Sequence, residues 1–408
     1  METQQIFQKI DTLKPQIIGA LAQLIRIPAI GPENNGEGEQ EKAEALTKIL
    51  KETGFDKIEH YDVEDPRVPS RKRPNIVATL NGETNAQKLW IVTHLDVVPA
   101  GEEALWKVTK PFEPFVIDNR VYGRGSEDNG QSLVASLFAI NALKLLGIKP
   151  KRTVKLAFVA DEEMGSTMGI QHLIGKNLFS KDDLVVVPDS GNPEGNFVEI
   201  AEKSILWLKI TTLGKQTHGS SPNKGLNAHR IGMQLAIALD ETLHAKYNER
   251  NDYFDVPYST FEPTKKDKNV DAVNIVPGED TLYFDCRILP NYSLEDVLTY
   301  INKAVADFEG KTGAKIHLEI LQKQSSPALV EGNSQAVALL KRAIKEARGV
   351  DATVGGVGGG TCAAFFRKVG IPAVVWSTVD EVAHQPDEYC VVGNLVADAK
   401  VFALLAFM

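Results

Sequence analysis

The sequence contains few cysteines and lacks long apolar runs. Among its 408 residues there are three cysteines, Cys286, Cys362 and Cys390, and no pair has the close spacing of a metal knuckle. An odd number fits no disulfide framework, so we expect a reducing compartment, the cytoplasm. No apolar run approaches the roughly 18 residues of a membrane span. Residues 1–9 also lack the charged-then-apolar order of a signal peptide.

An excess of basic charge is absent as well. The formal net charge is -9, and an acidic chain disfavours phosphate-rich partners, so we expect neither a nucleic-acid nor a membrane partner. No G-x-S-x-G motif is present, which disfavours a serine hydrolase. The apolar share of 43% is ordinary for a globular protein, and the length implies two or three domains.

Hydrophobic patterning predicts an α/β fold. Apolar positions from Ile6 to Leu24 recur at steps of three and four, which predicts a first helix that Pro15 starts or kinks. Further predicted helices lie at 40–53, 131–146 and 334–347 and at the C-terminus, and predicted strands lie at 75–80, 89–98, 154–160, 184–187 and 373–377. Strands that alternate with helices indicate a layered domain with a mostly parallel sheet.

The rhythm changes at residue 204, which predicts an inserted domain. Predicted strands lie at 204–213, 271–276, 281–289 and 315–321, and predicted helices at 227–247 and 293–311. The second and third strands are predicted to form a hairpin around Pro277 and Gly278, and residues 249–270 are predicted to form a loop. The order βαββαβ is ferredoxin-like. We therefore predict a catalytic domain made of 1–203 and 322–408, and an inserted domain made of 204–321.

Polar residues cluster where predicted strands end, and open α/β sheets bind their ligands at that edge. One strand leads into His94 and Asp96, and a His-x-Asp pair suits a metal ligand with a carboxylate that orients it. Another strand leads into Asp161, Glu162 and Glu163, three adjacent acids whose repulsion a cation or a raised pKa relieves. One such carboxylate can bind metal while its neighbour serves as a base.

Three further clusters are weaker signals when taken singly. Asp128 lies in a glycine-rich turn, Asp189 ends a strand, and His384 follows the strand predicted at 373–377. The alternative interpretations are a helix-capping turn for Asp128, an exposed acidic loop for residues 161–163 and a structural histidine for His94. Together the clusters offer two histidines and several carboxylates, a donor set that favours zinc, manganese or cobalt over calcium or magnesium.

The motifs resemble, in order, those of a known family. They are HLDVVP at 94–99, YGRGSED at 122–128, DEEMGS at 161–166, PDSG at 188–191, HGSSPNKGLNA at 218–228, NIVPG at 274–278, GGGT at 358–361 and AHQPDE at 383–388. The chain resembles the dizinc metallopeptidase and deacylase family of aminoacylase, carboxypeptidase G, acetylornithine deacetylase and succinyl-diaminopimelate desuccinylase. The resemblance implies a phosphorylase/hydrolase-like catalytic domain and an inserted ferredoxin-like lid.

The resemblance also implies a metal centre of two Zn²⁺ per chain, with Co²⁺ or Mn²⁺ as alternatives. In it Asp128 bridges both ions, His94 and Asp189 complete one site, and Glu163 and His384 complete the other. The peptide bond after Asp128 is often cis in this family. Two divalent ions with three carboxylate ligands retain one positive charge, which lowers the pKa of a shared water toward ~7.

Two further residues receive roles in catalysis through the same resemblance. Asp96 orients His94, and Glu162 is the general base that takes a proton from the attacking water and delivers it to the leaving amine.

The lid matches the family at residues that act on substrate. The resemblance implies that His218 stabilises the oxyanion in a neighbouring subunit, that Asn274 and Arg287 hold a substrate carboxylate, and that the lid forms a homodimer. Arginine suits this task because its fork pairs bidentately with a carboxylate. The glycine-rich segment 355–361, with Gly360 and Thr361, is a candidate backbone nest for the same anion.

Two positions depart from the family pattern. Asn129 and the two residues after it stand where Lys-Gly is frequent, and Cys362 stands where Asp is common. The metal ligands are retained, but neither departure favours one substrate. We therefore predict hydrolysis of an amide bond in a small carboxylate-bearing substrate, by a deacylase or desuccinylase, with a dipeptidase or carboxypeptidase as the alternative.

Two other classes of protein are weaker candidates. A nucleotide-binding oxidoreductase would use the glycine run at 355–360, but that run lacks G-x-G-x-x-G spacing and no convincing strand leads into it. A non-catalytic binding module on the same fold would not need to retain the base Glu162.

Overall fold

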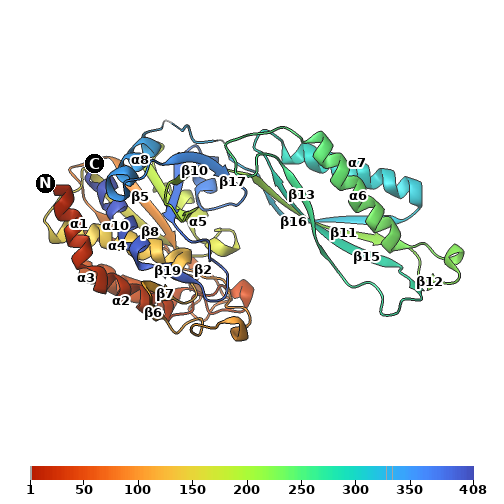
Figure 1. The fold of residues 1–408 in the computed structure, drawn as a ribbon, viewed down its shortest axis with the longest axis horizontal. Helices are drawn as coiled ribbons and strands as arrows, with labels where there is room; N and C mark the ends of the chain where they lie inside the picture. Colours follow the sequence, from red (N-terminus) through yellow and green to blue (C-terminus); the bar gives the residue numbers. More distant parts are fainter. Residues whose placement is uncertain (1, 328, 333) are drawn as a thin grey trace. The chain divides into compact units, whose positions relative to one another are not determined.

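The structure is a computed structural model that describes residues 2–327, 329–332 and 334–408. The chain divides into two compact units (Figure 1). The first contains 1–200, 329–354 and 361–408, and the second contains 201–328 and 355–360. The insertion predicted at 204–321 lies inside the second unit, which also includes flanking residues and most of the glycine run.

The first unit is built on an eight-stranded sheet with the order β1-β4-β8-β5-β9-β18-β10-β17. Its strands are β1 (Lys57–His60), β4 (Ile76–Leu80), β5 (Thr84–His94), β8 (Arg152–Val159), β9 (Leu184–Asn192), β10 (Phe197–Glu202), β17 (Thr353–Val357) and β18 (Ala373–Thr378). The central strands β8, β5, β9 and β18 run parallel. Strands β1, β4 and β10 pair antiparallel with their neighbours. The predicted mixed α/β fold is confirmed, and the parallel pairing is concentrated at the centre of the sheet.

Helices cover both faces of this sheet (Figure 1). One layer comprises α1 (Glu2–Thr12), α2 (Lys14–Ile25), α3 (Gln40–Thr53), α4 (Ser132–Leu145), α8 (Gln335–Arg348) and α10 (Val392–Phe407), and the other comprises α5 (Ile170–Gly175) and α9 (Ala363–Lys368). Successive strand residues alternate between the layers: Ile91 packs in the first cluster, while Trp90 and Val92 pack in the second. Both faces are therefore buried, as a parallel sheet requires.

The N-terminal helix predicted from Ile6 to Leu24 is two helices, α1 and α2. Pro15 lies in the first turn of α2, where its missing N–H costs no helical hydrogen bond. Of the two predicted effects of this proline, starting a helix is the one observed. Among the described residues, none of the helices has the length and apolar character that a membrane span requires.

Two small sheets complete the first unit. One pairs β2 (Val63–Glu64) with β3 (Lys72–Arg73), and the other has the order β19-β7-β6, with β6 (Phe115–Ile117), β7 (Arg120–Tyr122) and β19 (Tyr389–Val391). The pairing of Tyr389 with Tyr122 brings the segment that precedes β19 beside the segment that follows β7. This proximity positions part of the candidate site.

The second unit is a four-stranded antiparallel sheet with the order β13-β15-β11-β16. Its elements are β11 (Ser204–Leu213), α6 (Ala228–Lys246), β13 (Thr260–Lys266), β15 (Glu279–Ile288), α7 (Leu294–Thr312) and β16 (Lys315–Gln324). The two helices lie on one face of the sheet (Figure 1), and their buried side chains share one core with those of the sheet. Outside this sheet, β12 (Thr217–His218) pairs with β14 (Ile275–Val276).

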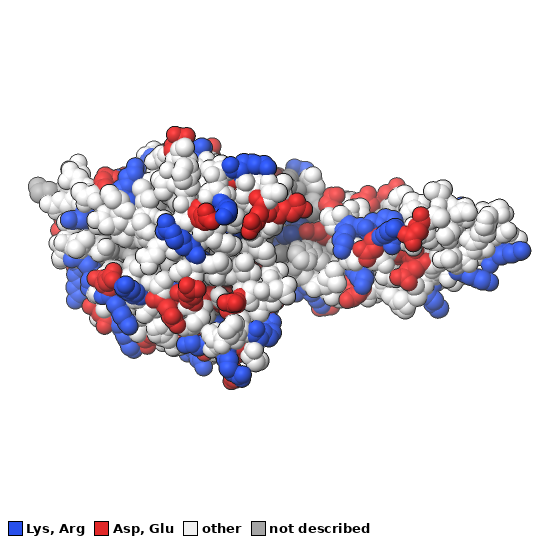
Figure 2. All heavy atoms as spheres, turned by 90° about the horizontal axis from the view of Figure 1, so that it is seen from below, with Lys and Arg blue, Asp and Glu red and all other residues white. Residues whose placement is uncertain are grey.

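The hairpin predicted around Pro277 and Gly278 was wrong. β15 pairs instead with β13, a strand inside the segment predicted as a loop. Most of β13 is exposed and it contains Pro263, so it lacks the apolar alternation that identifies a strand. Over the face shown in Figure 2, acidic and basic side chains are interspersed on both units.

Candidate active site

The parallel centre of the sheet gathers the predicted metal ligands of the first unit. His94 is the last residue of β5, Glu163 lies in the short turn η4 (Glu162–Met164) after β8, and Asp189 lies in β9. Because β8, β5 and β9 are adjacent and parallel, their carboxyl ends meet at one edge. Asp128 comes from the irregular turn η3 (Ser126–Gln131), and the peptide bond after it is cis, as expected.

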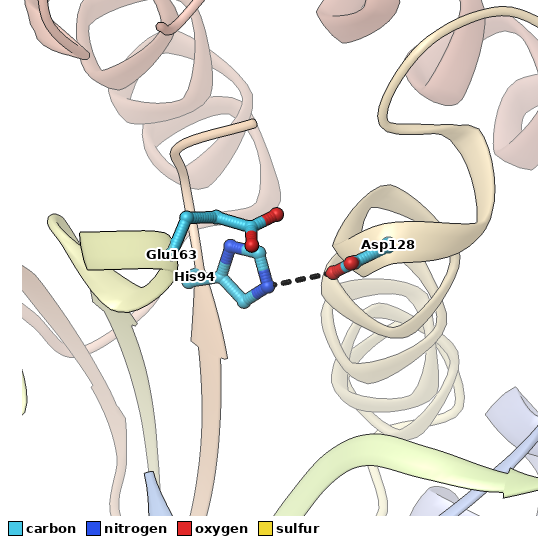
Figure 3. Close-up of side chains that lie close together, drawn as sticks. All are labelled: His94, Asp128 and Glu163. Carbon is cyan, nitrogen blue, oxygen red and sulfur yellow. Dashed lines mark hydrogen bonds and ion pairs between the residues drawn. The ribbon is translucent and has the colours of Figure 1, made fainter. Parts of the chain in front are cut away.

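Asp128 lies between the two histidines and turns one oxygen toward each. Its Oδ1 is 2.8 Å from His94 Nε2, and its Oδ2 is 3.0 Å from His384 Nε2. Asp189 Oδ1 lies 3.2 Å from His94 Nε2, and Glu163 Oε2 lies 3.1 Å from His384 Nε2. Figure 3 shows His94 and Asp128 facing each other, with the carboxylate of Glu163 nearby. The donors thus divide into two groups that share Asp128.

The donor set fits divalent transition ions. The ligand atoms of His94, Asp128 and Glu163 lie within 4.8 Å of one another, and so do those of His94, Glu162 and Asp189. Imidazole nitrogens combined with carboxylate oxygens suit zinc, cobalt or manganese. Several buried carboxylates at such distances also repel one another unless a cation compensates their charge.

The pKa values of the acids reflect this crowding. Burial, followed by the charge of Asp189, raises the pKa of Glu162 well above its usual range. Burial and the charge of Asp128 raise the pKa of Glu163 to about 7. Hydrogen bonds from the His384 imidazole to the carboxylates of Asp128 and Glu163 raise the pKa of His384 to about 10. Glu162, Glu163 and His384 therefore hold protons that bound cations would displace.

Asp96 contacts His94 in a different way from the one expected. His94 Nδ1 lies 3.0 Å from the backbone carbonyl of Asp96 and 3.5 Å from its carboxylate. The carboxylate instead accepts the backbone N–H groups of Glu162, at 3.1 Å, and Glu163, at 3.0 Å. The residue predicted to orient the histidine thus also holds the acidic turn, and it is 2% exposed.

The predicted lid residues lie in the second unit and form two local groups. His218 and Asn274 are neighbours, since β12 pairs with β14 and Gly219 N–H donates to the Asn274 carbonyl at 2.7 Å. Both side chains are exposed, and His218 Nδ1 lies 2.8 Å from Ser220 Oγ. In the other group, Arg287 pairs bidentately with Asp285.

The Arg287 group includes part of the glycine-rich segment. Arg287 Nη1 donates to the Gly358 carbonyl at 2.9 Å. Thr361 begins the returning part of the first unit, where its hydroxyl accepts Ala363 N–H at 3.1 Å. Gly360 remains in the second unit. Of the four residues predicted to hold the anion, Arg287 and Gly360 belong to the second unit and Thr361 to the first. The remaining one, Asn274, lies beside His218 in the second unit.

The glycine run is not wholly a loop, which corrects the expectation that no convincing strand leads into it. Its first residues belong to β17, so a strand does lead into the run. The ring of Phe254 lies 2.5 Å from where a Cβ on Gly356 would be, so close packing accounts for that glycine. Cys362 is 2% exposed and packs in the apolar cluster on the α5 and α9 face.

Several residues that support the proposed metal ligands were not assigned a role in the sequence analysis. Asn129 Nδ2 donates to Asp189 Oδ1 at 2.7 Å and to the Pro188 carbonyl at 2.8 Å, so it holds a predicted ligand. The buried Lys42 ammonium donates to the Leu95 carbonyl at 2.9 Å, and burial lowers its pKa to about 8. The two acids that flank Asp128 and His384 in their motifs, Glu127 and Glu388, are buried too. In the sequence, only their positions in the motifs YGRGSED and AHQPDE could have drawn attention to these two acids.

Fold and site together define a metal-dependent hydrolase of the α/β class. The profile of Peptidase family M20/M25/M40 matches residues 90–407. The chain belongs to this family, and the predicted hydrolase class and the recognised family are confirmed.

Individual relatives agree with this assignment. An uncharacterized metallohydrolase of Methanocaldococcus jannaschii is 42% identical over 397 residues, which cover 93% of this chain and 96% of the relative. A succinyl-diaminopimelate desuccinylase of Methylobacterium radiotolerans is 29% identical over 381 residues, 92% of each chain. Human carnosine dipeptidase 1 superposes with a TM-score of 0.78 at 17% identity, covering 100% of this chain and 98% of that structure, which shows a shared fold.

Proposed function

We propose that this enzyme hydrolyses an amide bond in a small carboxylate-bearing substrate with two transition ions, zinc in the first instance. The observation that carries the proposal is the position of the Asp128 carboxylate. Its Oδ1 lies 2.8 Å from His94 Nε2, and its Oδ2 lies 3.0 Å from His384 Nε2. A carboxylate so placed could offer one oxygen to each of two cations. His94 and Asp189 are the proposed remaining ligands of one ion, and Glu163 and His384 those of the other.

The proposed mechanism assigns proton transfer to Glu162. Two bound divalent ions supply Lewis acidity and lower the pKa of an attacking water toward ~7. Glu162 takes the proton of that water and then delivers it to the nitrogen of the departing amine. The backbone N–H bond to Asp96 fixes the turn from which Glu162 extends.

The second unit supplies the proposed substrate contacts. His218 is proposed to stabilise the oxyanion in the active site of a partner subunit in a homodimer. Asn274, Arg287 and the segment at Gly360 and Thr361 are proposed to hold the substrate carboxylate. Arg287 is kept in a fixed orientation by its bidentate pairing with Asp285, which reduces the entropy lost on binding.

The proposed activity is a deacylase or desuccinylase reaction, as in the desuccinylase relatives. A dipeptidase or carboxypeptidase reaction is the second candidate, because the same base and ions serve a peptide bond equally well.

A substrate panel tests the proposal and separates these candidates. The purified chain is loaded with Zn²⁺, Co²⁺ or Mn²⁺ and assayed with N-acyl and N-succinyl amino acids, dipeptides and their carboxamide analogues. We expect turnover of an acyl amino acid with a free carboxylate and a loss of kcat/KM for its carboxamide. Preference for dipeptides would select the second candidate. Full turnover after removal of all transition metal would overturn the mechanism.

A further inference from the structure

Two buried glutamates next to the proposed metal ligands bind each other's loops. Glu127 precedes Asp128, and Glu388 follows His384 by four residues. The exposed fraction is 4% for Glu127 and 0% for Glu388. Neither residue lies among the proposed ligands, bases or substrate contacts.

Glu388 binds the turn that carries Asp128. Its Oε1 accepts the backbone N–H groups of Glu127, at 3.0 Å, and Asp128, at 3.1 Å. Its Oε2 accepts Gly125 N–H at 3.1 Å and Arg124 Nη1 at 2.6 Å. One carboxylate thus satisfies three backbone donors of an irregular turn and one guanidinium.

Glu127 binds the segment that leads into His384. Its Oε1 accepts Asp380 N–H at 2.6 Å, and its Oε2 accepts the N–H groups of Val382, at 2.7 Å, and Ala383, at 3.0 Å. Arg124 adds a bond from Nη2 to the His384 carbonyl at 3.2 Å. Each segment therefore supplies the carboxylate that orders the other.

The loop at 380–388 needs such support. It contains no regular helix or strand, and Glu381, His384 and Asp387 adopt the left-handed region with φ of 60°, 64° and 56°. Non-glycine residues reach this region at a cost in backbone energy, so surrounding contacts must hold them there. His384 is also 53% exposed at its side chain, and it gains little stabilisation from packing.

We propose that Glu127 and Glu388 are positioning residues that form a reciprocal clamp, which fixes Asp128 and His384 at the spacing of the metal ion they share. This inference rests on the proposed two-metal site. Both carboxylates of the clamp are engaged by backbone N–H groups, so neither is assigned as a metal ligand or substrate contact. It lowers the reorganisation that metal binding requires, because both ligands are already held by hydrogen bonds to buried carboxylates.

Metal-binding measurements on purified, metal-stripped chains test the clamp. The variants are Glu127→Gln and Glu388→Gln, which keep side-chain volume but replace one acceptor oxygen with a donor. Asp183→Asn is the matched control, because Asp183 is 1% exposed and accepts Ser180 N–H and Lys88 N–H elsewhere in the unit. Zinc affinity and stoichiometry are measured by competition with a chromophoric chelator, and folding is checked by circular dichroism.

We expect each glutamine variant to weaken zinc binding about 10- to 100-fold at the site that includes His384, with a smaller effect on the other site through the shared Asp128, while Asp183→Asn leaves both unchanged. Equal affinities in the wild type, the glutamine variants and the control would overturn the clamp. A wild-type chain that binds no transition ion would instead overturn the proposed function. If Glu388→Gln fails to fold, Arg124→Lys is the substitute variant. It removes the guanidinium bonds to Glu388 and to the His384 carbonyl, and it should weaken the same site by a smaller factor.

The double variant Glu127→Gln/Glu388→Gln tests the reciprocity. Because both glutamates act on the same ion, we expect the double variant to weaken its site less than the product of the single effects. Effects that multiply fully would mean two independent loop supports, and they would overturn the coupled clamp.

Discussion

The imidazole of His94 lies closer to the backbone carbonyl of Asp96 than to its carboxylate, at 3.0 Å against 3.5 Å. A main-chain carbonyl can therefore fix the proposed ligand, and the side chain is available for another task. Its oxygens accept the N–H groups of Glu162 and Glu163. Asp96 thus joins a histidine ligand to the turn that holds the proposed base.

Asp96→Asn should reduce turnover more than it reduces metal affinity. The backbone contact to His94 remains, whereas an amide nitrogen now faces one of the two N–H donors of the acidic turn. We expect kcat to fall about 10- to 100-fold and zinc affinity to change much less. Steady-state kinetics and zinc titration measure the two quantities separately. A variant that loses zinc and turnover in equal proportion would show that the carboxylate acts mainly on His94.

Glu162→Gln should retain metal and lose turnover. The amide fills the same volume but cannot accept the proton of the attacking water, so we expect kcat to fall by several orders of magnitude, at least ~10². Metal analysis of the same sample should still find about two ions per chain. Glu163→Gln is the contrasting variant, and it should lose an ion as well. Near-normal turnover of Glu162→Gln would remove this residue as the base.

Removal of the metal should destabilise the chain as well as stop turnover. Ions that bind only the folded state stabilise it by about 4 kcal/mol when their free concentration is 1,000 times Kd. We expect chelation to lower the Tm and re-addition of Zn²⁺, Co²⁺ or Mn²⁺ to restore it. Calorimetry measures the Tm, and metal analysis measures the bound ions. Ca²⁺ is the control, because the histidine-containing donor set disfavours it. A chelated chain with unchanged Tm and full activity would contradict this prediction.

The proposed metal ligands could be predicted from the sequence because each lies in a short motif that matches the family. Their supports could not. Glu388 Oε1 and the N–H of Glu127 belong to residues 261 positions apart, and nothing in either motif indicates which backbone donors a buried carboxylate accepts. β13 was missed for another reason, because it is an edge strand whose exposed polar residues resemble a loop. The sequence pattern records which faces are buried, whereas long-range hydrogen bonds depend on the completed fold.

Asp398 should impose a measurable pH dependence on stability. Burial raises its pKa to about 6, partly offset by Arg348 and by hydrogen bonds from Thr378 and Gln131. Between pH about 4 and about 6 the folded chain therefore keeps a proton that the unfolded chain releases. Stability from this group is greatest below pH about 4 and is lost as the pH rises to about 6, by an amount on the order of 3 kcal/mol.

Asp398→Asn should abolish this component, because an amide does not titrate. Urea unfolding of metal-free wild type and variant, from pH 4 to pH 7, should give a free-energy difference that changes across this window. The same comparison for Asp183→Asn controls for the loss of a buried carboxylate elsewhere in the unit. Stability curves for wild type and Asp398→Asn that run parallel over the whole range would contradict the prediction.

His218→Ala should separate oxyanion stabilisation from substrate binding. The imidazole is exposed in the second unit, and Ser220 fixes its Nδ1, so its Nε2 is the nitrogen oriented outward for a ligand. If it stabilises an oxyanion, we expect kcat to fall about 10²-fold with little change in KM and none in zinc stoichiometry. His244→Ala is the control, since His244 lies on α6 of the same unit and contacts the Asp240 carbonyl. A rise in KM at constant kcat would assign His218 to substrate binding. Mixing the impaired variants His218→Ala and Glu162→Gln extends the test, because a histidine that acts on a partner subunit should raise the turnover of a mixed dimer above that of either variant alone.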